Sequence, residues 1–184
     1  MSAAGLVLAA GEGRRFGGTK QLAELEGRPL LEHALAAMTG VTPRVVVLGH
    51  AADEILARVD LQGARPVVCQ GWREGQAASL RCGLAALDDA DEVVVVLGDQ
   101  PGITAAAVAA VAAAGGDADA VRATYAGVPG HPVLLRRPLL ARAAELRGDT
   151  GFRTLLERAR VRQVEVGHLA DPADIDTREE LARQ

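Results

Sequence analysis

The stretch Leu6–Leu22, LVLAAGEGRRFGGTKQL, decides the fold. It joins a short apolar run to a loop that contains four glycines and two arginines and ends near a lysine. An apolar run of this length that is bounded by glycine predicts a buried strand. In doubly wound α/β sheets, ligands bind beyond the carboxyl ends of the strands. We therefore expect the loop after this strand to be a ligand site.

The rest of the chain continues the alternation of strand and helix. The run VVVVL predicts a strand that is covered on both faces, as in a parallel sheet. The pattern predicts an α/β fold of three layers (α/β/α, Rossmann-like), with a mostly parallel central sheet and right-handed crossovers. Strands are expected at residues 5–10, 44–48, 66–69, 92–97, 118–124, 133–135 and 161–166, and helices at residues 30–38, 53–59, 77–87, 105–114, 139–146 and 152–158.

Two helix starts carry capping signals. Thr177 followed by Glu180 has the spacing of a capping box, which predicts a terminal helix. Capping of the helix at residues 152–158 is one of two interpretations of Asp149 and Thr150, the other being a functional role of the segment RGDTGFRTLL. The Gly- and Pro-rich stretch at residues 126–138 predicts a loop with one short strand at residues 133–135.

Composition excludes several classes of protein. The 184 residues fit one domain, and the net charge of −4 with 2% aromatic residues argues against nucleic-acid binding. No apolar run approaches the ~20 residues that span a bilayer, so we expect no membrane association and a cytoplasmic location. Cys69 and Cys82 have no metal-binding or redox spacing, and we expect buried, reduced thiols.

The loop has the chemistry of a polyphosphate site. Gly11 and Gly13 allow backbone N–H groups to approach an anion closely, and Arg14, Arg15 and Lys20 supply positive charge. Lys20 is the single lysine among 20 basic residues. The alternative is a mobile surface loop with solvated arginines.

Two familiar phosphate motifs do not match this loop. A P-loop requires Gly-Lys-Ser/Thr, but Lys20 lies between Thr19 and Gln21. The dinucleotide fingerprint GxGxxG requires a glycine where this chain has Phe16. A generic dinucleotide-binding oxidoreductase is disfavoured for the same reason.

The segment LAAGEGRRFGGTKQL resembles the signature LAAGxGxRxGxxK of nucleotidyltransferases with the sugar-nucleotide-transferase fold, specifically the molybdenum cofactor branch. The resemblance extends from Gly5 to about Leu181. It implies that the loop wraps the triphosphate of a nucleotide, that Arg15 and Lys20 contact its phosphates, and that these two residues act with Asp99 in catalysis. The nucleotide-binding residues that it implies are Leu8, Ala9, Ala10, Gly11, Gly13, Arg14, Arg15, Lys20, Ser79 and Gly98.

An acidic residue follows the most hydrophobic predicted strand. A carboxylate at Asp99, in GDQP, can hold a hard cation such as Mg²⁺ together with substrate phosphates. The alternative is a turn-forming aspartate. GDQP resembles the GDxP metal motif of the same family, and the DIDT segment resembles one that returns a second acidic residue to the metal. Asp176 matches that position better than Asp174, although Asp176 could instead serve the start of the terminal helix.

Two further segments point to the substrates. EGQAASLRCGL resembles the EGMSSSLRxGL segment of molybdopterin cytidylyltransferases, which places Ser79 at the nucleotide; the alternative is a capping or solvent-facing serine. GHPVLL matches the same branch and makes His131 a candidate for contact with the acceptor, together with Gln100 and Pro101. The alternative for His131 is a surface-loop histidine.

The resemblance implies a Mg²⁺-dependent transfer of CMP from CTP to the terminal phosphate of molybdopterin, with release of pyrophosphate. Residues 1–125 would bind the nucleotide, and residues 126–184 would form the acceptor side and the terminal helix of one domain. The partners implied are these small molecules and a transient contact with a molybdoenzyme or its maturation factor. The alternatives are GTP as donor, a sugar or polyol phosphate as acceptor, and a non-catalytic nucleotide or cofactor carrier.

Overall fold

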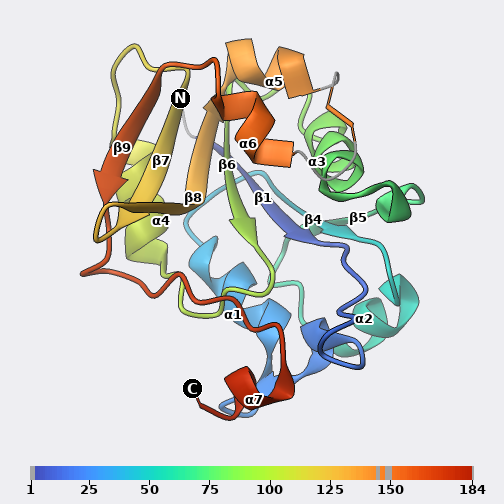
Figure 1. Ribbon diagram of the computed structural model, residues 1–184. Helices are drawn as coiled ribbons and strands as arrows, with labels where there is room; N and C mark the ends of the chain where they lie inside the picture. Colours follow the sequence, from blue (N-terminus) through green and yellow to red (C-terminus); the bar gives the residue numbers. More distant parts are fainter. Residues whose placement is uncertain (1–2, 144–145, 148–150, 184) are drawn as a thin grey trace.

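Seven strands form one sheet in the computed structural model, which describes residues 3–143, 146–147 and 151–183 (Figure 1). The strand order is β5-β4-β1-β6-β8-β7-β9. All neighbours run parallel except β8, which is antiparallel to both β6 and β7. The mostly parallel sheet is therefore confirmed. The strands are β1 (Ala4–Ala9), β4 (Arg44–Leu48), β5 (Arg65–Val68), β6 (Glu92–Leu97), β7 (Ala120–Tyr125), β8 (Val128–Arg136) and β9 (Val161–Glu165).

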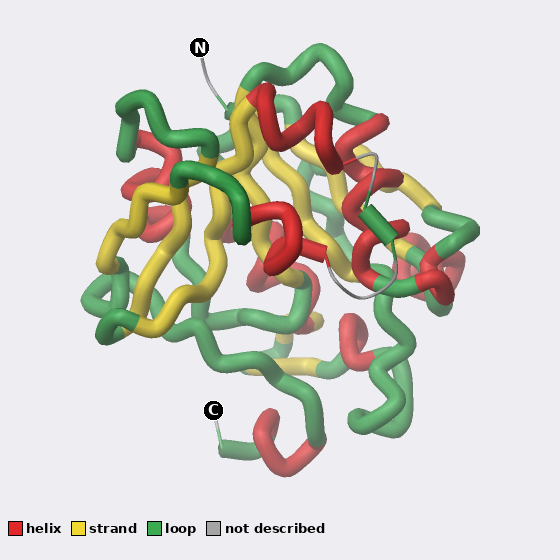
Figure 2. Tube along the Cα trace, turned by 45° about the horizontal axis from the view of Figure 1, so that its top comes forward, coloured by secondary structure: helices red, strands yellow, loops and turns green. Residues whose placement is uncertain are grey.

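Helices cover both faces of the sheet, because successive strand residues point to opposite faces and both sets are apolar (Figure 2). Val7 and its equivalents pack on one face against α1 (Leu30–Ala37), α2 (Ala52–Arg58) and α4 (Ala105–Ala113). Leu6 and its equivalents pack on the other face. That face is covered by α3 (Gln76–Ala85), α5 (Arg137–Ala143) and α6 (Gly151–Leu156). The three expected layers are present.

The terminal helix begins at the predicted capping box. The Thr177 hydroxyl accepts from the N–H of Glu180, and the Glu180 carboxylate accepts from the N–H of Thr177, so the predicted capping box opens α7 (Arg178–Leu181). Residues 144–145 of the helix expected at 139–146, and the expected caps Asp149 and Thr150, lie outside the described residues. Within the described chain, no helix has the length and apolarity to cross a membrane.

Short elements around the end of β1 had no clear sequence signal. They are the 3₁₀ helices η1 (Lys20–Leu22) and η2 (Trp72–Glu74) and a small hairpin of β2 (Glu24–Leu25) and β3 (Arg28–Pro29). Elements this short depend on contacts with their surroundings rather than on their own periodicity.

The prediction for residues 126–138 is wrong in part. The expected short strand at 133–135 is the end of a nine-residue strand, β8, which contains Pro129 and Pro132. Proline cannot donate to a ladder and is found at sheet edges or bulges. Here β6 pairs with β8 only from Val133 onward, and the register with β7 shifts before Pro129 is reached. The prolines therefore lie where one edge of β8 pairs with no neighbouring strand, so no backbone N–H is needed on that edge.

The prediction of reduced cysteines is also wrong. Cys69 follows β5, and Cys82 lies on α3, which packs back over the same face of the sheet. Their Cα atoms are 5.8 Å apart, within the usual range for a disulfide, and the two residues form one. A separation of 13 residues carries no motif, so the pairing depends on how α3 folds onto the sheet.

Candidate functional site

The glycine-rich loop, residues 11–19, begins where β1 ends. Gly13 has φ +66°, and a Cβ there would lie 2.7 Å from the carbonyl oxygen of Gly18, so the turn requires glycine. Phe16, the residue that breaks the dinucleotide fingerprint, is buried and packs with Leu30 and Ile175. The loop is therefore anchored by an aromatic side chain and leaves its backbone exposed around that anchor.

Gln21 holds the end of β1, and sequence reasoning missed it. Its side chain is only 3% exposed. Its Nε2 donates to the carbonyl oxygens of Ala9, at 2.8 Å, and Gly11, at 2.9 Å, which flank the point where strand becomes loop. A polar residue in η1 between Lys20 and Leu22 gives no sequence signal of burial, because only the folded chain brings it under the loop.

A second segment, the C-terminal strap (residues 171–176), passes beneath the sheet from β9 to α7 (Figure 1). Three hydrogen bonds fasten it to the turn after β6. The N–H of Ile175 donates to Asp99 O at 2.9 Å, and the N–H of Asp171 donates to Gly102 O at 3.1 Å. Gln100 Nε2 donates to Pro172 O at 3.0 Å. The strap is thus built onto the turn that carries Asp99.

The loop, the turn and the strap bring four charged side chains together. Lys20 Nζ lies 2.7 Å from Asp99 Oδ2 and 3.0 Å from Asp176 Oδ1. Arg15 Nη2 lies 2.6 Å from Asp176 Oδ2. Burial opposes the charge of Lys20, but the charges and hydrogen bonds of the two carboxylates outweigh it and raise the pKa of Lys20.

A cavity of about 240 Å³ lies over this cluster, and a second of about 480 Å³ adjoins it. Both are lined by the glycine-rich loop and Asp99. The first is lined by Leu8, Ala9, Gly11, Gly13, Arg14, Arg15, Lys20, Gln21, Gly98, Asp99 and Asp176. The second is lined by Leu8, Ala10, Gly11, Glu12, Gly13, Arg14, Trp72, Arg73, Gly75, Gln76, Ser79, Leu97 and Asp99. The residues predicted to bind the nucleotide therefore line these two adjoining cavities.

The carboxylates fit a divalent cation whose coordination shell is completed by oxygens of its substrate. Asp99 Oδ1 is buried and has no hydrogen-bond partner among the described residues. In that part of the chain, no group of three or more His, Cys, Asp or Glu side chains forms a metal cage. Mg²⁺ usually takes one or two carboxylates plus phosphate oxygens and water, and Asp99 and Asp176 match that donor set.

Residues 5–165 match the family described as the MobA-like NTP transferase domain. The chain belongs to this family. Members of the family are nucleotidyltransferases, which act on small-molecule nucleotides. The mostly parallel sheet and the cavity beyond the end of β1 agree with that membership.

Three known proteins are similar to this MobA-like domain over nearly its whole length. It is 32% identical to nicotine blue oxidoreductase of Paenarthrobacter nicotinovorans, over 97% of this chain and 94% of that one. A crystal structure of the Rv0371c homologue from Mycobacterium sp. strain JC1 has 39% identity and a TM-score of 0.84, covering 98% and 93%. Rv0371c of Mycobacterium tuberculosis, solved as a complex with manganese, has 30% identity and a TM-score of 0.81, covering 100% and 97%.

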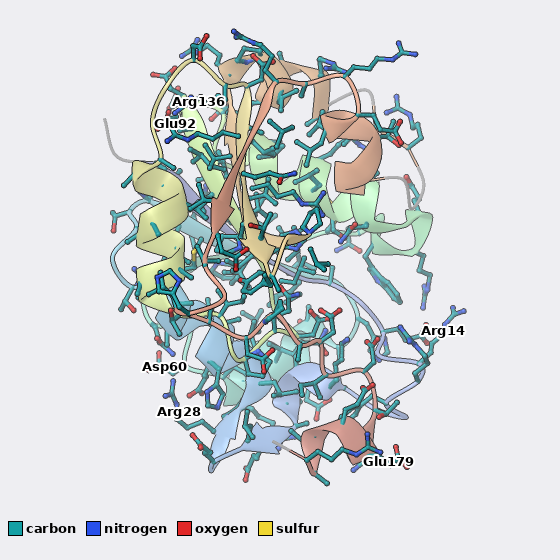
Figure 3. All side chains as sticks on the ribbon, turned by 60° about the vertical axis from the view of Figure 1, so that its left-hand side comes forward. Arg14, Arg28, Asp60, Glu92, Arg136 and Glu179 are labelled. Atoms are coloured by element: carbon teal, nitrogen blue, oxygen red, sulfur yellow. A yellow bond between two sulfur atoms is a disulfide. The ribbon has the colours of Figure 1, made fainter. Side chains whose placement is uncertain are left out.

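Predicted and unpredicted residues of this MobA-like domain line the second cavity. Ser79 is buried on α3 and lines that cavity, whereas the alternative had it face solvent or cap the helix. Trp72 and Arg73 line the same cavity and were not predicted; the guanidinium of Arg73 lies 4.7 Å from the centre of the Trp72 ring. Arg14 pairs with Glu12 at 2.7 Å and reaches outward at the rim (Figure 3).

The structure does not bring the predicted acceptor residues into either cavity. Gln100, Pro101 and His131 are absent from both linings. The side chain of Gln100 donates a hydrogen bond to the strap instead. Burial, with a smaller contribution from the Arg122 charge, lowers the pKa of His131 to about 4, so its ring is neutral at pH 7. A neutral ring carries no charge for a phosphate.

Proposed function

We propose that this protein is a Mg²⁺-dependent nucleotidyltransferase that transfers CMP from CTP to the terminal phosphate of a molybdopterin-type acceptor. One observation carries the proposal. Lys20, Asp99 and Asp176 meet within hydrogen-bond distance under the glycine-rich loop, although they are far apart in the sequence. A cation-bearing loop and paired carboxylates at one cavity suit a metal–triphosphate complex.

The reaction needs charge stabilisation more than acid–base chemistry. The acceptor phosphate attacks the α-phosphorus, the new phosphoanhydride bond forms, and the bond to the β-phosphate breaks as pyrophosphate leaves. The acceptor phosphate is already ionised near neutral pH, so no general base is needed. Arg15 and the backbone N–H groups of the loop would neutralise the charge that builds on the leaving oxygens. A divalent ion held by Asp99 and Asp176 would supply further positive charge there.

The choice of CTP and molybdopterin is supported by sequence segments that resemble the cytidylyltransferase branch. SLRCGL contains Ser79, which lines the second cavity, and GHPV contains His131. GTP as donor, or a sugar or polyol phosphate as acceptor, would use the same charge cluster. A transient contact with a molybdoenzyme or its maturation factor would deliver the product.

The direct experiment offers CTP, GTP, ATP and UTP in turn, with molybdenum cofactor and Mg²⁺, and measures pyrophosphate release. We expect release with CTP. Release with GTP alone would overturn the cytidylyl assignment and keep the transferase. Nucleotide binding without pyrophosphate release from any donor would support the non-catalytic carrier.

A matched pair of variants tests the metal role of the strap. Asp176→Asn should raise the Mg²⁺ concentration needed for half-maximal rate, because it removes one of the two carboxylates. Asp117→Asn is the control, since Asp117 is 97% exposed and pairs with Arg160 instead. Equal Mg²⁺ dependence for both variants would remove Asp176 from the metal site.

A redox reaction is the second candidate, because the relative at 32% identity over nearly the whole chain is named an oxidoreductase. The same protein preparation can be tested for binding of reduced nicotinamide nucleotides by fluorescence. Phe16 stands where the dinucleotide fingerprint needs glycine, so we expect no binding. Tight binding together with no pyrophosphate release would favour the redox candidate.

A further inference from the structure

Lys20 lies where the proposed metal ion would have to lie. Its ammonium bonds to Asp99 Oδ2 at 2.7 Å and to Asp176 Oδ1 at 3.0 Å, which places one positive charge between the two carboxylates. The other oxygen of Asp176 is held by Arg15 at 2.6 Å. Both oxygens of Asp176 therefore already have a cationic partner.

We propose that Lys20 competes with the divalent ion for these carboxylates, and that the ion enters together with the nucleotide, whose phosphates take over the ammonium. The proposal rests on the function proposed above and adds a regulation of the same site. It makes Lys20 a resident cation when the site is empty and a phosphate ligand when the site is filled.

Electrostatics makes the two arrangements mutually exclusive. An ammonium and a divalent ion within about 3 Å of the same oxygens repel strongly where the protein excludes water. The Lys20 side chain is 11% exposed, against 25% for Asp99 and 26% for Asp176, so little solvent separates the charges. With Lys20 in place, Asp99 Oδ1 is the one oxygen of these two carboxylates that has no hydrogen-bond partner among the described residues.

The geometry also gives the Lys20 ammonium a second position, in the cavity beneath the glycine-rich loop. Its stem lies beneath the glycine-rich loop, with Cγ 3.4 Å from where a Cβ on Gly13 would be. The same loop and the same lysine line the cavity of about 240 Å³. A lysine ammonium is a compact charge on a flexible stem, so rotation of its side chain can carry it from carboxylate to phosphate without moving the backbone.

This exchange couples metal and nucleotide. The metal alone must displace Lys20 and leave a buried ammonium without a partner, which weakens binding. The nucleotide supplies that partner, so each ligand should strengthen the binding of the other. Weak affinity for free metal and strong affinity for the metal–nucleotide complex then follow from one side chain.

The experiment titrates the purified full chain with Mn²⁺ alone and follows free Mn²⁺ by electron paramagnetic resonance. Lys20→Met should bind Mn²⁺ about tenfold more tightly than the wild type without nucleotide, because two partly buried ion pairs no longer compete. Lys20→Gln is a second neutral variant that guards against misfolding of the first. Arg58→Ala removes an arginine that pairs with Glu54 and lines neither cavity, and it should match the wild type.

A second arm adds CTP. The order should then reverse, with the wild type binding Mn²⁺ more tightly than either neutral variant. Equal or weaker Mn²⁺ binding by folded Lys20→Met and Lys20→Gln, without nucleotide, would overturn the proposal. The same holds if Lys20→Met with Asp99→Asn keeps the gain, since the gain would then arise elsewhere. The arm without nucleotide uses no acceptor, so it remains readable even if the pyrophosphate assay refutes the proposed function.

Discussion

Gly102 tests how the strap presents Asp176 to the metal site. The residue lies in the turn after β6, and its backbone φ lies outside the left-handed region, so alanine brings no strain of its own. A Cβ there would lie 2.7 Å from the carbonyl oxygen of Asp171, whereas ordinary contact begins at 3.4 Å. The turn and the strap must therefore separate by about 0.7 Å, because the obstacle is backbone rather than a flexible side chain.

The magnitude follows from the bonds that this movement breaks. An opening of that size takes the 3.1 Å bond from Asp171 N to Gly102 O outside hydrogen-bond range. Overpacking of this kind costs about 1–3 kcal/mol. For a chain of this size we expect Tm to fall by about 3–10 °C. If about 1 kcal/mol of the cost appears as lost positioning of Asp176, the affinity for Mn²⁺ falls about fivefold.

The assay compares Gly102→Ala with Gly40→Ala, at which a Cβ would meet nothing within 4 Å. Both are melted by circular dichroism and titrated with Mn²⁺. The Gly40 variant should match the wild type in metal affinity and lie close to it in Tm. A Gly102 variant with unchanged Tm and unchanged Mn²⁺ affinity would refute the claim that this turn holds the strap.

Three further predictions concern residues around the site and the sheet. Gln21→Leu should lower the free energy of unfolding by about 1–3 kcal/mol in urea titrations, because the buried carbonyl of Ala9 and the partly buried carbonyl of Gly11 lose their donor; an unchanged midpoint would contradict this. Glu165 accepts bonds mainly from backbone N–H groups, which lower its pKa to about 2 from 4.5, so its stabilisation is present above pH 4.5 and is lost as the pH falls toward 2. Glu165→Gln should therefore lower Tm at pH 7 by a margin that shrinks in acid, and a constant margin would argue against the role. Reduction of the Cys69–Cys82 disulfide should lower the free energy of unfolding by about 3 kcal/mol. The wild type should therefore melt at a lower Tm in reductant, whereas Cys82→Ser should not respond to reductant. A wild-type Tm that is insensitive to reductant would disprove the disulfide.

Local patterns were enough to predict the sheet and the loop. The runs at Arg44–Leu48 and Glu92–Leu97 became strands with the expected bounds, because each is apolar without a break after its first residue and is followed by glycine. The glycine-rich loop was found because its glycines and cations are adjacent in the sequence. Asp99 was found because it follows a buried strand directly.

What sequence reasoning missed depends on contacts between distant segments. Gln21 is recognised only when η1 is seen beneath the end of β1. The disulfide depends on the packing of α3 over β5, and the length of β8 depends on which of its sides is paired. A motif resemblance suggested Asp176, but its contact with Lys20 follows from three hydrogen bonds of the strap that no sequence pattern encodes.

The central claim is tested most directly by a crystal structure of the protein with Mn²⁺ and CTP, in which the ion is located by its anomalous scattering. The account predicts one peak within coordinating distance of Asp99 and Asp176, the triphosphate along the loop of residues 11–19, and Lys20 Nζ on a phosphate oxygen. An ion bound away from both carboxylates, with Lys20 still bridging them beside a bound triphosphate, would contradict it.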